Sequence, residues 1–408
     1  NNSKNTDVPV KNIPNDERIS RLGELFIKEF GDKASFYVRV PGRVNIIGEH
    51  IDYCGYPVLP MALEQDILVA ARLIKEPEIY LSNVNEKYSN FKINVKCYED
   101  IDIKPDSSGK PFWYNYVMCG IKGALEYLNN KVVNGLQILV DGNIPPASGL
   151  SSSSALVSAA CLSFLFAQNV NMKKTEIASL CATSERYIGT QGGGMDQAIA
   201  FLAEKYSAQY ITWQPLNASS VALPEDAAFV VAHSLAEANK AATNDFNRRV
   251  IECRLAAKIL GEKTGASTDK KIITLSQVQK NLGNSLDDMI KLVQEYLPSN
   301  IYTKQEICNI LNITENEMDN LFLTENTKHL NEFKLKQRAL HVYEEAVRVE
   351  EFRKICTKSS LNGQSPVSNG TNDKTLDILG NLMFNSHRSL RELYECSHEN
   401  LDRLVELS

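Results

Sequence analysis

The run PGRVNIIGEHIDY occupies residues 41–53, near the start of the chain. Its valine and isoleucines predict a strand, but they are surrounded by charged or titratable groups: Arg43, Glu49, His50 and Asp52. An ordinary core strand does not end in Glu-His-x-Asp, because buried charges are costly unless they are paired. The run therefore predicts a strand that enters a polar pocket, of a kind that can hold a small polyhydroxylated molecule.

Length and composition restrict the class of protein. With 408 residues, of which 43% are hydrophobic and 23% charged, the chain can form two or three domains around a large core. A net charge of -6 and the lack of a long basic block argue against a nucleic-acid partner. The sequence contains no run of 18 apolar residues, so no membrane span is expected. The polar N-terminus does not look like a secretory signal. We expect a cytoplasmic protein, and nothing in the sequence requires more than a monomer.

Cysteine and histidine spacing gives no metal site. The nine cysteines include no Cys-x-x-Cys pair, and the six histidines form no metal-binding pattern. Such cysteines are typical of free, buried thiols in a reducing compartment.

Local patterns predict a mixture of helices and strands. Helices are expected over residues 18–30, 113–128, 152–168, 175–187, 241–260 and 376–407, and strands over 35–47, 65–73, 135–141 and 227–232. Residues 262–330 are interpreted as several short helices, and the helix pair at 302–321 within them as packing rather than DNA binding. The stretch 357–373, rich in Ser, Asn and Gly, predicts a flexible loop. This mixture predicts an α+β fold with two domains.

A second informative run, PPASGLSSSSA, occupies residues 145–155 directly before an amphipathic helix. A helix N-terminus carries unsatisfied N–H groups and a partial positive charge, and small residues let phosphate oxygens approach the backbone. Serine hydroxyls add hydrogen bonds, and one of them can reach Mg²⁺. A plain serine N-cap is the alternative, but the glycine and four consecutive serines favour an anion site.

A third run, SERYIG at residues 184–189 followed by GGGMDQ at 192–197, carries two carboxylates. Glu185 lies in the last turn of a predicted helix, where the negative end of the dipole is unfavourable for it. Either Mg²⁺ or a nearby arginine would offset that charge, and the spacing leaves both possibilities open. Asp196 follows three glycines, where the backbone can approach a ligand, although such an Asp is usually a turn residue. Together the three runs suggest a phosphoryl transfer site.

These runs resemble known family signatures. Residues 42–53 are similar to the galactokinase signature, and the serine loop is similar to the ATP motif of the wider superfamily of galactokinase, homoserine, mevalonate and phosphomevalonate (GHMP) kinases. GTQGGGMDQ at 189–197, NIPP at 143–146 with the four serines, and NKAAT at 239–243 look like the N-acetylgalactosamine kinase branch. The resemblance extends from about residue 36 to the last residue.

The resemblance implies a two-domain GHMP kinase fold. A disordered tail (1–17) would precede an N-terminal domain (18–222) that is ribosomal protein S5 domain 2-like and carries the sugar and ATP motifs. A ferredoxin-like C-terminal domain (223–408) would contain the helical insertion 262–330. The family carries a further glycine-rich motif after the segment present here, so the C-terminal domain is expected to be incomplete, truncated at Ser408.

The resemblance also implies ATP-dependent phosphorylation of the anomeric C1 hydroxyl of N-acetylgalactosamine, and more weakly of galactose, giving the sugar 1-phosphate and ADP. Asp196 would be the catalytic base, and Arg43 would keep it ionised and stabilise charge on the transferred phosphoryl group. The implied sugar ligands are Arg43, Glu49, His50, Asp52, Gly193 and Asp196. The implied ATP ligands are Trp113, Gly149, Leu150, Ser151, Ser152, Ser153 and Ser154, although Trp113 is equally typical of a core residue. Ser153 and Glu185 would bind Mg²⁺, the expected cofactor.

Two other functions have less support. A catalytically silent sensor of galactose and ATP usually has an altered serine loop, whereas the loop and Asp196 are intact here. Homoserine or mevalonate phosphorylation does not explain the Glu-His-x-Asp ending of the first run. No single residue distinguishes N-acetylgalactosamine from galactose.

Overall fold

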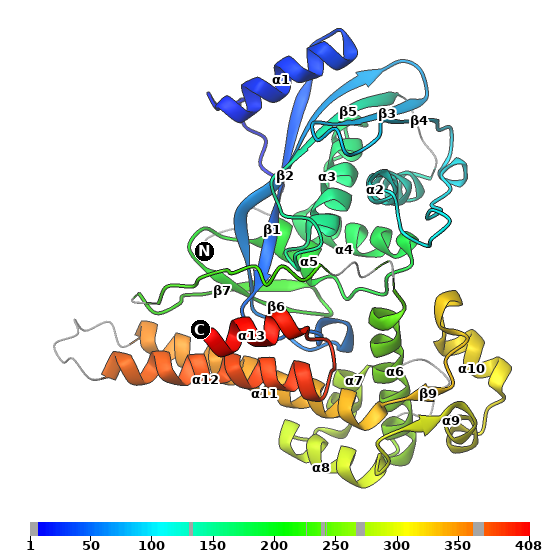
Figure 1. Cartoon of the computed structure of the whole chain (residues 1–408), viewed down its shortest axis with the longest axis vertical. Helices are drawn as coiled ribbons and strands as arrows, with labels where there is room; N and C mark the ends of the chain where they lie inside the picture. Colours follow the sequence, from blue (N-terminus) through cyan, green and yellow to red (C-terminus); the bar gives the residue numbers. More distant parts are fainter. Residues whose placement is uncertain are drawn as a thin grey trace. The chain divides into compact units, whose positions relative to one another are not determined.

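The computed structural model describes residues 7–129, 134–225, 227–237, 241, 243–266, 274–361 and 371–408 (Figure 1). The chain forms two compact units and passes between them several times. The first unit comprises Asn1–Val44, Ala62–Ala203 and Glu237–Ala242, and the second comprises Asn45–Met61, Glu204–Ala236 and Thr243–Ser408. The run that opens the sequence is therefore shared between the units, because Arg43 belongs to the first and residues 45–53 to the second.

The first unit is built on a five-stranded sheet with the order β1-β2-β5-β3-β4. Its strands are β1 (Phe36–Asn45), β2 (Pro60–Ile74), β3 (Glu78–Asn83), β4 (Phe91–Asn94) and β5 (Gly135–Gly142). β2 and β5 are antiparallel, with Val69 opposite Val140, whereas β3 and β5 are parallel. The strands predicted around β1, β2 and β5 are confirmed, and the shorter β3 and β4 were not predicted.

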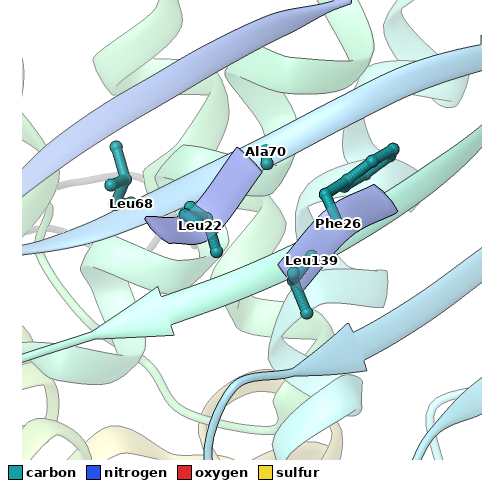
Figure 2. Packing of buried hydrophobic residues seen from close by; sticks show 5 residues of the cluster. All are labelled: Leu22, Phe26, Leu68, Ala70 and Leu139. Carbon is teal, nitrogen blue, oxygen red and sulfur yellow. The ribbon is translucent and has the colours of Figure 1, made fainter. Parts of the chain in front are cut away.

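Helix α1 (Glu17–Phe30) covers one face of this sheet. Its buried Leu22 and Phe26 are four residues apart, so they share one face of the helix. They pack on three buried residues of β2 and β5, namely Leu68, Ala70 and Leu139 (Figure 2). The helix ends at Gly31, whose φ of 80° confirms the predicted C-cap.

Four further helices complete the first unit: α2 (Trp113–Tyr127), α3 (Ser152–Ala167), α4 (Lys174–Glu185) and α5 (Met195–Leu202). A Cβ on Gly120 of α2 would lie 2.3 Å from the carbonyl oxygen of Val157, so glycine is what allows α2 and α3 to pack so closely. Gly123 has the same role against Ser184 of α4. These close contacts hold α2 against the middle of α3 and against the last turn of α4, the turn that carries Glu185.

The second unit is largely helical. Its helices are α6 (Asp245–Lys263), α7 (Leu275–Leu282), α8 (Leu286–Tyr296), α9 (Lys304–Leu311), α10 (Glu315–Phe322), α11 (Leu335–Leu361), α12 (Thr371–Glu392) and α13 (Glu399–Leu407). Its strands form two-stranded sheets, β6 (Ala208–Thr212) with β7 (Asn217–Val221) and β8 (Tyr302–Thr303) with β9 (Glu332–Phe333). The long α11 contacts α6, α8 and α12, and Figure 1 shows it running beside α12. Within its described residues this unit contains no larger sheet, so the expected ferredoxin-like sheet is not seen in that part.

Several predictions for the second unit need correction. The strand expected over 227–232 is wrong: these residues form no regular structure, because a strand needs a neighbour to pair with and no described strand provides one. The loop expected over 357–373 is wrong at both ends, since α11 continues to residue 361 and α12 begins at 371; residues 362–370 lie outside the described residues. Elongating an existing helix is favourable even through Ser-containing sequence.

Other expectations for this unit fare better. The short helices expected over 262–330 are present as α7 to α10, and Ile307 and Met318 of the predicted helix pair are buried, as the packing interpretation requires. The helix predicted over 376–407 is divided into α12 and α13. None of the nine cysteines, all of which lie in the described residues, forms a disulfide, and seven are buried, as their structural interpretation predicts. No helix in the described part of the chain combines the length and apolar character needed to cross a membrane.

Candidate active site

Arg43, which is buried, and Asp196, which is half-buried, form an ion pair in the first unit. The Arg43 Nε donates to Asp196 Oδ1 at 2.7 Å, and Arg43 Nη1 donates to the carbonyl oxygen of Gly149 at 2.5 Å. Arg43 is only 4% exposed. The guanidinium therefore connects the carboxylate predicted to be the base with the loop predicted to hold phosphate.

Local backbone geometry places both partners. Gly42 lies against the serine loop, where a Cβ would be 2.9 Å from the carbonyl oxygen of Leu150, and the same carbonyl accepts a hydrogen bond from the Arg43 backbone at 3.2 Å. Asp196 lies in the first turn of α5, behind Gly194 with a φ of 105°. Glycine permits that left-handed conformation, and the positive end of the helix dipole favours a carboxylate in the first turn.

The serine loop folds through a series of left-handed residues into α3. Ala147, Gly149 and Ser151 have φ angles of 55°, 77° and 60°. Strained backbone of this kind is common at ligand-binding sites. Ser151 is the N-cap of α3, and within the described residues its buried Oγ has no hydrogen-bond partner. The first turn of α3 begins with Ser152 and Ser153, so the predicted phosphate residues do surround a helix N-terminus.

Ser154 brings together two carboxylates. Its Oγ lies 2.9 and 2.8 Å from the two oxygens of Glu185 and 3.2 Å from Asp196 Oδ2. A hydroxyl has one proton to donate, so it satisfies one of these three acceptors at a time. Gln197 Nε2 donates to Glu185 Oε2 at 2.5 Å. The sequence interpretation assigned Ser153 to the metal, whereas the serine that contacts the carboxylates is Ser154.

This cluster fits a magnesium ion. Mg²⁺ is usually bound through one or two carboxylates together with phosphate oxygens of the substrate, rather than by a complete protein cage. Glu185 and the Ser154 hydroxyl supply hard oxygen ligands of this kind, and a cation would offset the negative charge of Glu185. In the described residues no group of three or more His, Cys, Asp or Glu side chains forms a metal cage by itself.

Trp113 is the first residue of α2. Its Nε1 donates to the carbonyl oxygen of Ser89 at 2.8 Å, and its ring centroid lies 5.9 Å from that of Tyr88. The indole is thus anchored at its polar end against the segment between β3 and α2.

The remaining sugar residues of the opening run belong to the second unit. Asn45 Nδ2 donates to Glu49 Oε2 at 3.0 Å, which holds the Glu49 carboxylate. Asp52 begins a short 3₁₀ turn (Asp52–Cys54), in which its carbonyl accepts from the Gly55 backbone at 2.9 Å. Gly193, by contrast, belongs to the first unit, just ahead of α5.

His50 begins a chain of polar groups. Its Nδ1 lies 2.9 Å from the Tyr53 hydroxyl, which lies 2.6 Å from the Tyr394 hydroxyl, which in turn is 3.2 Å from Cys253 Sγ. Burial raises the pKa of both tyrosines well above their usual value, so both hydroxyls stay protonated. The contact with Tyr53 holds the imidazole ring of His50, whose backbone is left-handed with a φ of 65°.

Sequence interpretation missed several residues that shape these sites. Gln197, Asn45, Tyr53 and Tyr394 contact predicted site residues but were not singled out. Gln197, Asn45 and Tyr53 are adjacent to or inside the recognised runs, so their position was a usable signal. Tyr394 is 341 residues from Tyr53, and nothing in its surrounding sequence marks it.

Two family models and several known proteins match the chain. Residues 24–73 match the family described as the galactokinase galactose-binding signature, and residues 115–204 match the N-terminal domain of GHMP kinases. The chain is 38% identical over 411 residues to a galactokinase of Dictyostelium discoideum, covering 97% of this chain and 81% of that protein. It is 30% identical over 440 residues to a galactokinase of Saccharomyces cerevisiae, covering 96% and 81%.

A solved structure shares the fold. The crystal structure of Lactococcus lactis galactokinase complexed with galactose aligns with a TM-score of 0.63 and 24% identity, covering 96% of this chain and 84% of that one. Taken with the two signature matches and the relatives across nearly the whole length, this shows that the chain belongs to the galactokinase family of GHMP kinases, with the α+β fold of that superfamily.

Proposed function

We propose that the chain is an ATP-dependent sugar-1-kinase that transfers the γ-phosphoryl group of ATP to the C1 hydroxyl of galactose and N-acetylgalactosamine, giving the sugar 1-phosphate and ADP. The observation that carries the proposal is the Arg43–Asp196 ion pair, which also contacts the serine loop through Gly149. A base that takes the proton of the sugar hydroxyl must be an ionised group close to the ATP phosphates. Asp196 meets this requirement, because Arg43 holds it beside the serine loop.

The proposed step uses Asp196 as the base. As the C1 oxygen forms its bond to the γ-phosphorus, the hydroxyl proton passes to the Asp196 carboxylate. The bond between the γ-phosphorus and the bridging oxygen breaks, and ADP leaves with that electron pair. Arg43 holds the orientation of Asp196 and offsets negative charge that spreads over the transferred phosphoryl group.

The serine loop is proposed to bind the ATP phosphates. Gly149 to Ser154 present backbone N–H groups at the start of α3, where the helix dipole favours anions. Glu185 and Ser154 would hold Mg²⁺, with Ser153 of the same turn as a further hydroxyl, while Asp196 stays available as the base. Bound Mg²⁺ would neutralise phosphate charge. The adenine is proposed to lie near Trp113.

Sugar recognition is assigned to Glu49, His50, Asp52 and Gly193 together with Arg43. Carboxylate and imidazole groups that pair with ring hydroxyls reject analogues lacking those hydroxyls, because an unpaired buried polar group is costly. The names of the relatives favour galactose as a substrate, whereas the branch motifs favour N-acetylgalactosamine. The NKAAT part of those motifs falls largely outside the described residues.

A direct test measures ADP release by the chain with Mg·ATP and either sugar, with glucose as the control. The proposal predicts turnover on at least one of the two galactose-type sugars, far above that on glucose. Tight binding of galactose and ATP without ADP release would support a silent sensor instead. A ratio of kcat/KM for the two sugars then gives the preference.

A further inference from the structure

Two buried side chains of α11 contact the backbone of the sugar signature, although neither belongs to any recognised motif. Glu345 Oε1 accepts a hydrogen bond from the Gly48 backbone N–H at 2.8 Å. His341 Nε2 lies 3.0 Å from the carbonyl oxygen of Glu49. A carbonyl can only accept, so Nε2 carries the proton and donates it. Both residues lie on one face of α11, because they are four positions apart.

These two side chains are themselves fixed by their surroundings. Both are fully buried. The Ser389 hydroxyl lies 2.9 Å from His341 Nδ1 and is its donor when Nε2 is protonated, and Ser386 Oγ donates to Glu345 Oε1 at 2.7 Å. Arg348 Nε pairs with the other Glu345 oxygen at 2.6 Å. Residues of α12 therefore hold two side chains of α11, and these in turn hold residues 48–50, which we call the signature loop. Both carboxylate oxygens of Glu345 and both ring nitrogens of His341 have hydrogen-bond partners.

The loop that they hold is one that needs external support. Gly48 has a φ of 101° and His50 a φ of 65°, so Glu49 is flanked by left-handed residues on both sides. Glycine adopts such a conformation readily, but for His50 it is costly and persists only when the surrounding structure determines it. The two bonds to α11 hold the loop on either side of the Gly48–Glu49 peptide, and they thereby fix the direction in which the side chains of Glu49 and His50 project.

We propose that His341 and Glu345 are positioning residues that set sugar affinity from outside the signature, by holding residues 48–50 in their binding conformation. This rests on the proposed function, in which Glu49 and His50 contact the sugar. Loss of either bond is expected to weaken sugar binding while leaving ATP binding unchanged, because the serine loop has no part in these contacts.

The test separates the bond to Glu49 from the bond to Ser389. A glutamine at position 341 extends an amide to the place of Nε2 and can still donate to Glu49, whereas an asparagine reaches only the place of Nδ1. We expect His341→Asn to raise the Kd of galactose by about tenfold or more, and His341→Gln to stay within about threefold of the unchanged protein. Titration calorimetry measures both, with ATP titrated in parallel as the internal reference.

Tyr343→Phe is the matched control. Tyr343 is buried two positions along α11, and its hydroxyl donates to the carbonyl oxygen of Leu275 at 3.3 Å rather than to residues 48–50. This variant should lose stability without a change in sugar affinity. Glu345→Gln is a second test variant, to be used if His341→Asn fails to fold. It keeps an acceptor oxygen but weakens the ion pair with Arg348. It should raise the galactose Kd by about threefold or more.

The outcomes are distinguishable. Equal galactose affinity in His341→Asn and His341→Gln, or a shift in ATP affinity as large as the shift for the sugar, would overturn the positioning role while leaving the kinase proposal intact. If His341→Asn fails to fold, unchanged galactose affinity in Glu345→Gln overturns it. Failure of the unchanged protein to bind galactose or N-acetylgalactosamine would overturn both proposals. Because binding is measured directly, the test does not depend on turnover.

Discussion

The predicted functional residues of the two units are stabilised in different ways. In the first unit the predicted functional groups hold one another: Arg43 pairs with Asp196, and Ser154 contacts Asp196 and Glu185. In the second unit the signature loop is held through its backbone by His341 and Glu345, which belong to no recognised run. Sequence motifs identify nearly all the residues that contact one another in the first unit. In the second unit they identify the signature loop but not His341 and Glu345, which hold it.

The difference predicts different consequences of mutation. Where functional groups hold one another, a single change removes chemistry and geometry together, and the loss appears in kcat. Where supports lie outside the motif, a change alters the conformation of the loop, and the loss appears in sugar affinity or in stability.

The largest effect is expected for Asp196→Ala. Loss of the proposed base should lower kcat by about 10³-fold, within the range that general-base catalysis contributes, while galactose binding stays measurable. The comparison of kcat with galactose Kd checks this. Retention of full activity would remove the role assigned to Asp196 and make the first unit a binding site only.

A smaller effect is expected for Ser154→Ala. Without the hydroxyl, Glu185 and Asp196 lose the donor that lies between them, and the expected cost of about 1–3 kcal/mol corresponds to roughly 5- to 150-fold in kcat/KM. The measurement is a Mg²⁺ titration of activity, in which the variant should need more metal. Ser163→Ala is the control, because its buried Oγ donates only within α3, to the Ala159 carbonyl at 2.7 Å. An equal loss in both variants would point to helix stability rather than the site.

The signature loop is tested by a pair of glycine changes. A Cβ on Gly48, at a φ of 101°, would lie 2.9 Å from Val349 Cγ2, so Gly48→Ala should lower the free energy of unfolding by about 1–3 kcal/mol. Gly380 lies exposed inside α12, and in the described structure nothing is within 4 Å of its Cβ position. Gly380→Ala should therefore stabilise by about 0.5–1 kcal/mol. Urea unfolding measures both; the same sign for both would contradict the described packing of the loop.

The smallest effect concerns pH. Desolvation lowers the pKa of His341 to about 4, with Glu345 opposing and Arg348 adding to the shift. The folded form therefore binds fewer protons than the unfolded form between about pH 6.5 and pH 4, so this contribution to stability is complete above about pH 6.5 and is lost as the pH falls through that window. By pH 5.5 the loss should be about 1 kcal/mol.

The measurement for this prediction is the difference in unfolding free energy between the unchanged protein and His341→Gln at each pH. Other titrating groups largely cancel in that difference. A difference that does not change between about pH 7 and pH 5 would show that His341 is not desolvated as described.

How much the sequence could predict depends on where the determining contacts lie. Arg43 and Asp196 are 153 residues apart, yet each lies in a recognisable run, so their meeting was expected. The choice of Ser154 over Ser153 as the hydroxyl next to the carboxylates depends on the rotation of the first turn of α3, which no spacing rule determines. His341 is one polar residue in a long helix, and only tertiary packing shows its contact with Glu49. For the same reason α11 itself and the short strands β3 and β4 were not predicted.

The most direct test of the central claim is phosphorus NMR of the product formed from Mg·ATP and galactose, or N-acetylgalactosamine, by the unchanged protein and by Asp196→Ala. The proposed chemistry predicts phosphate on C1 of the sugar, formed in equal amount with ADP, and its near-complete loss in the variant. Phosphate on another carbon, or ATP consumed without any sugar phosphate, would contradict it.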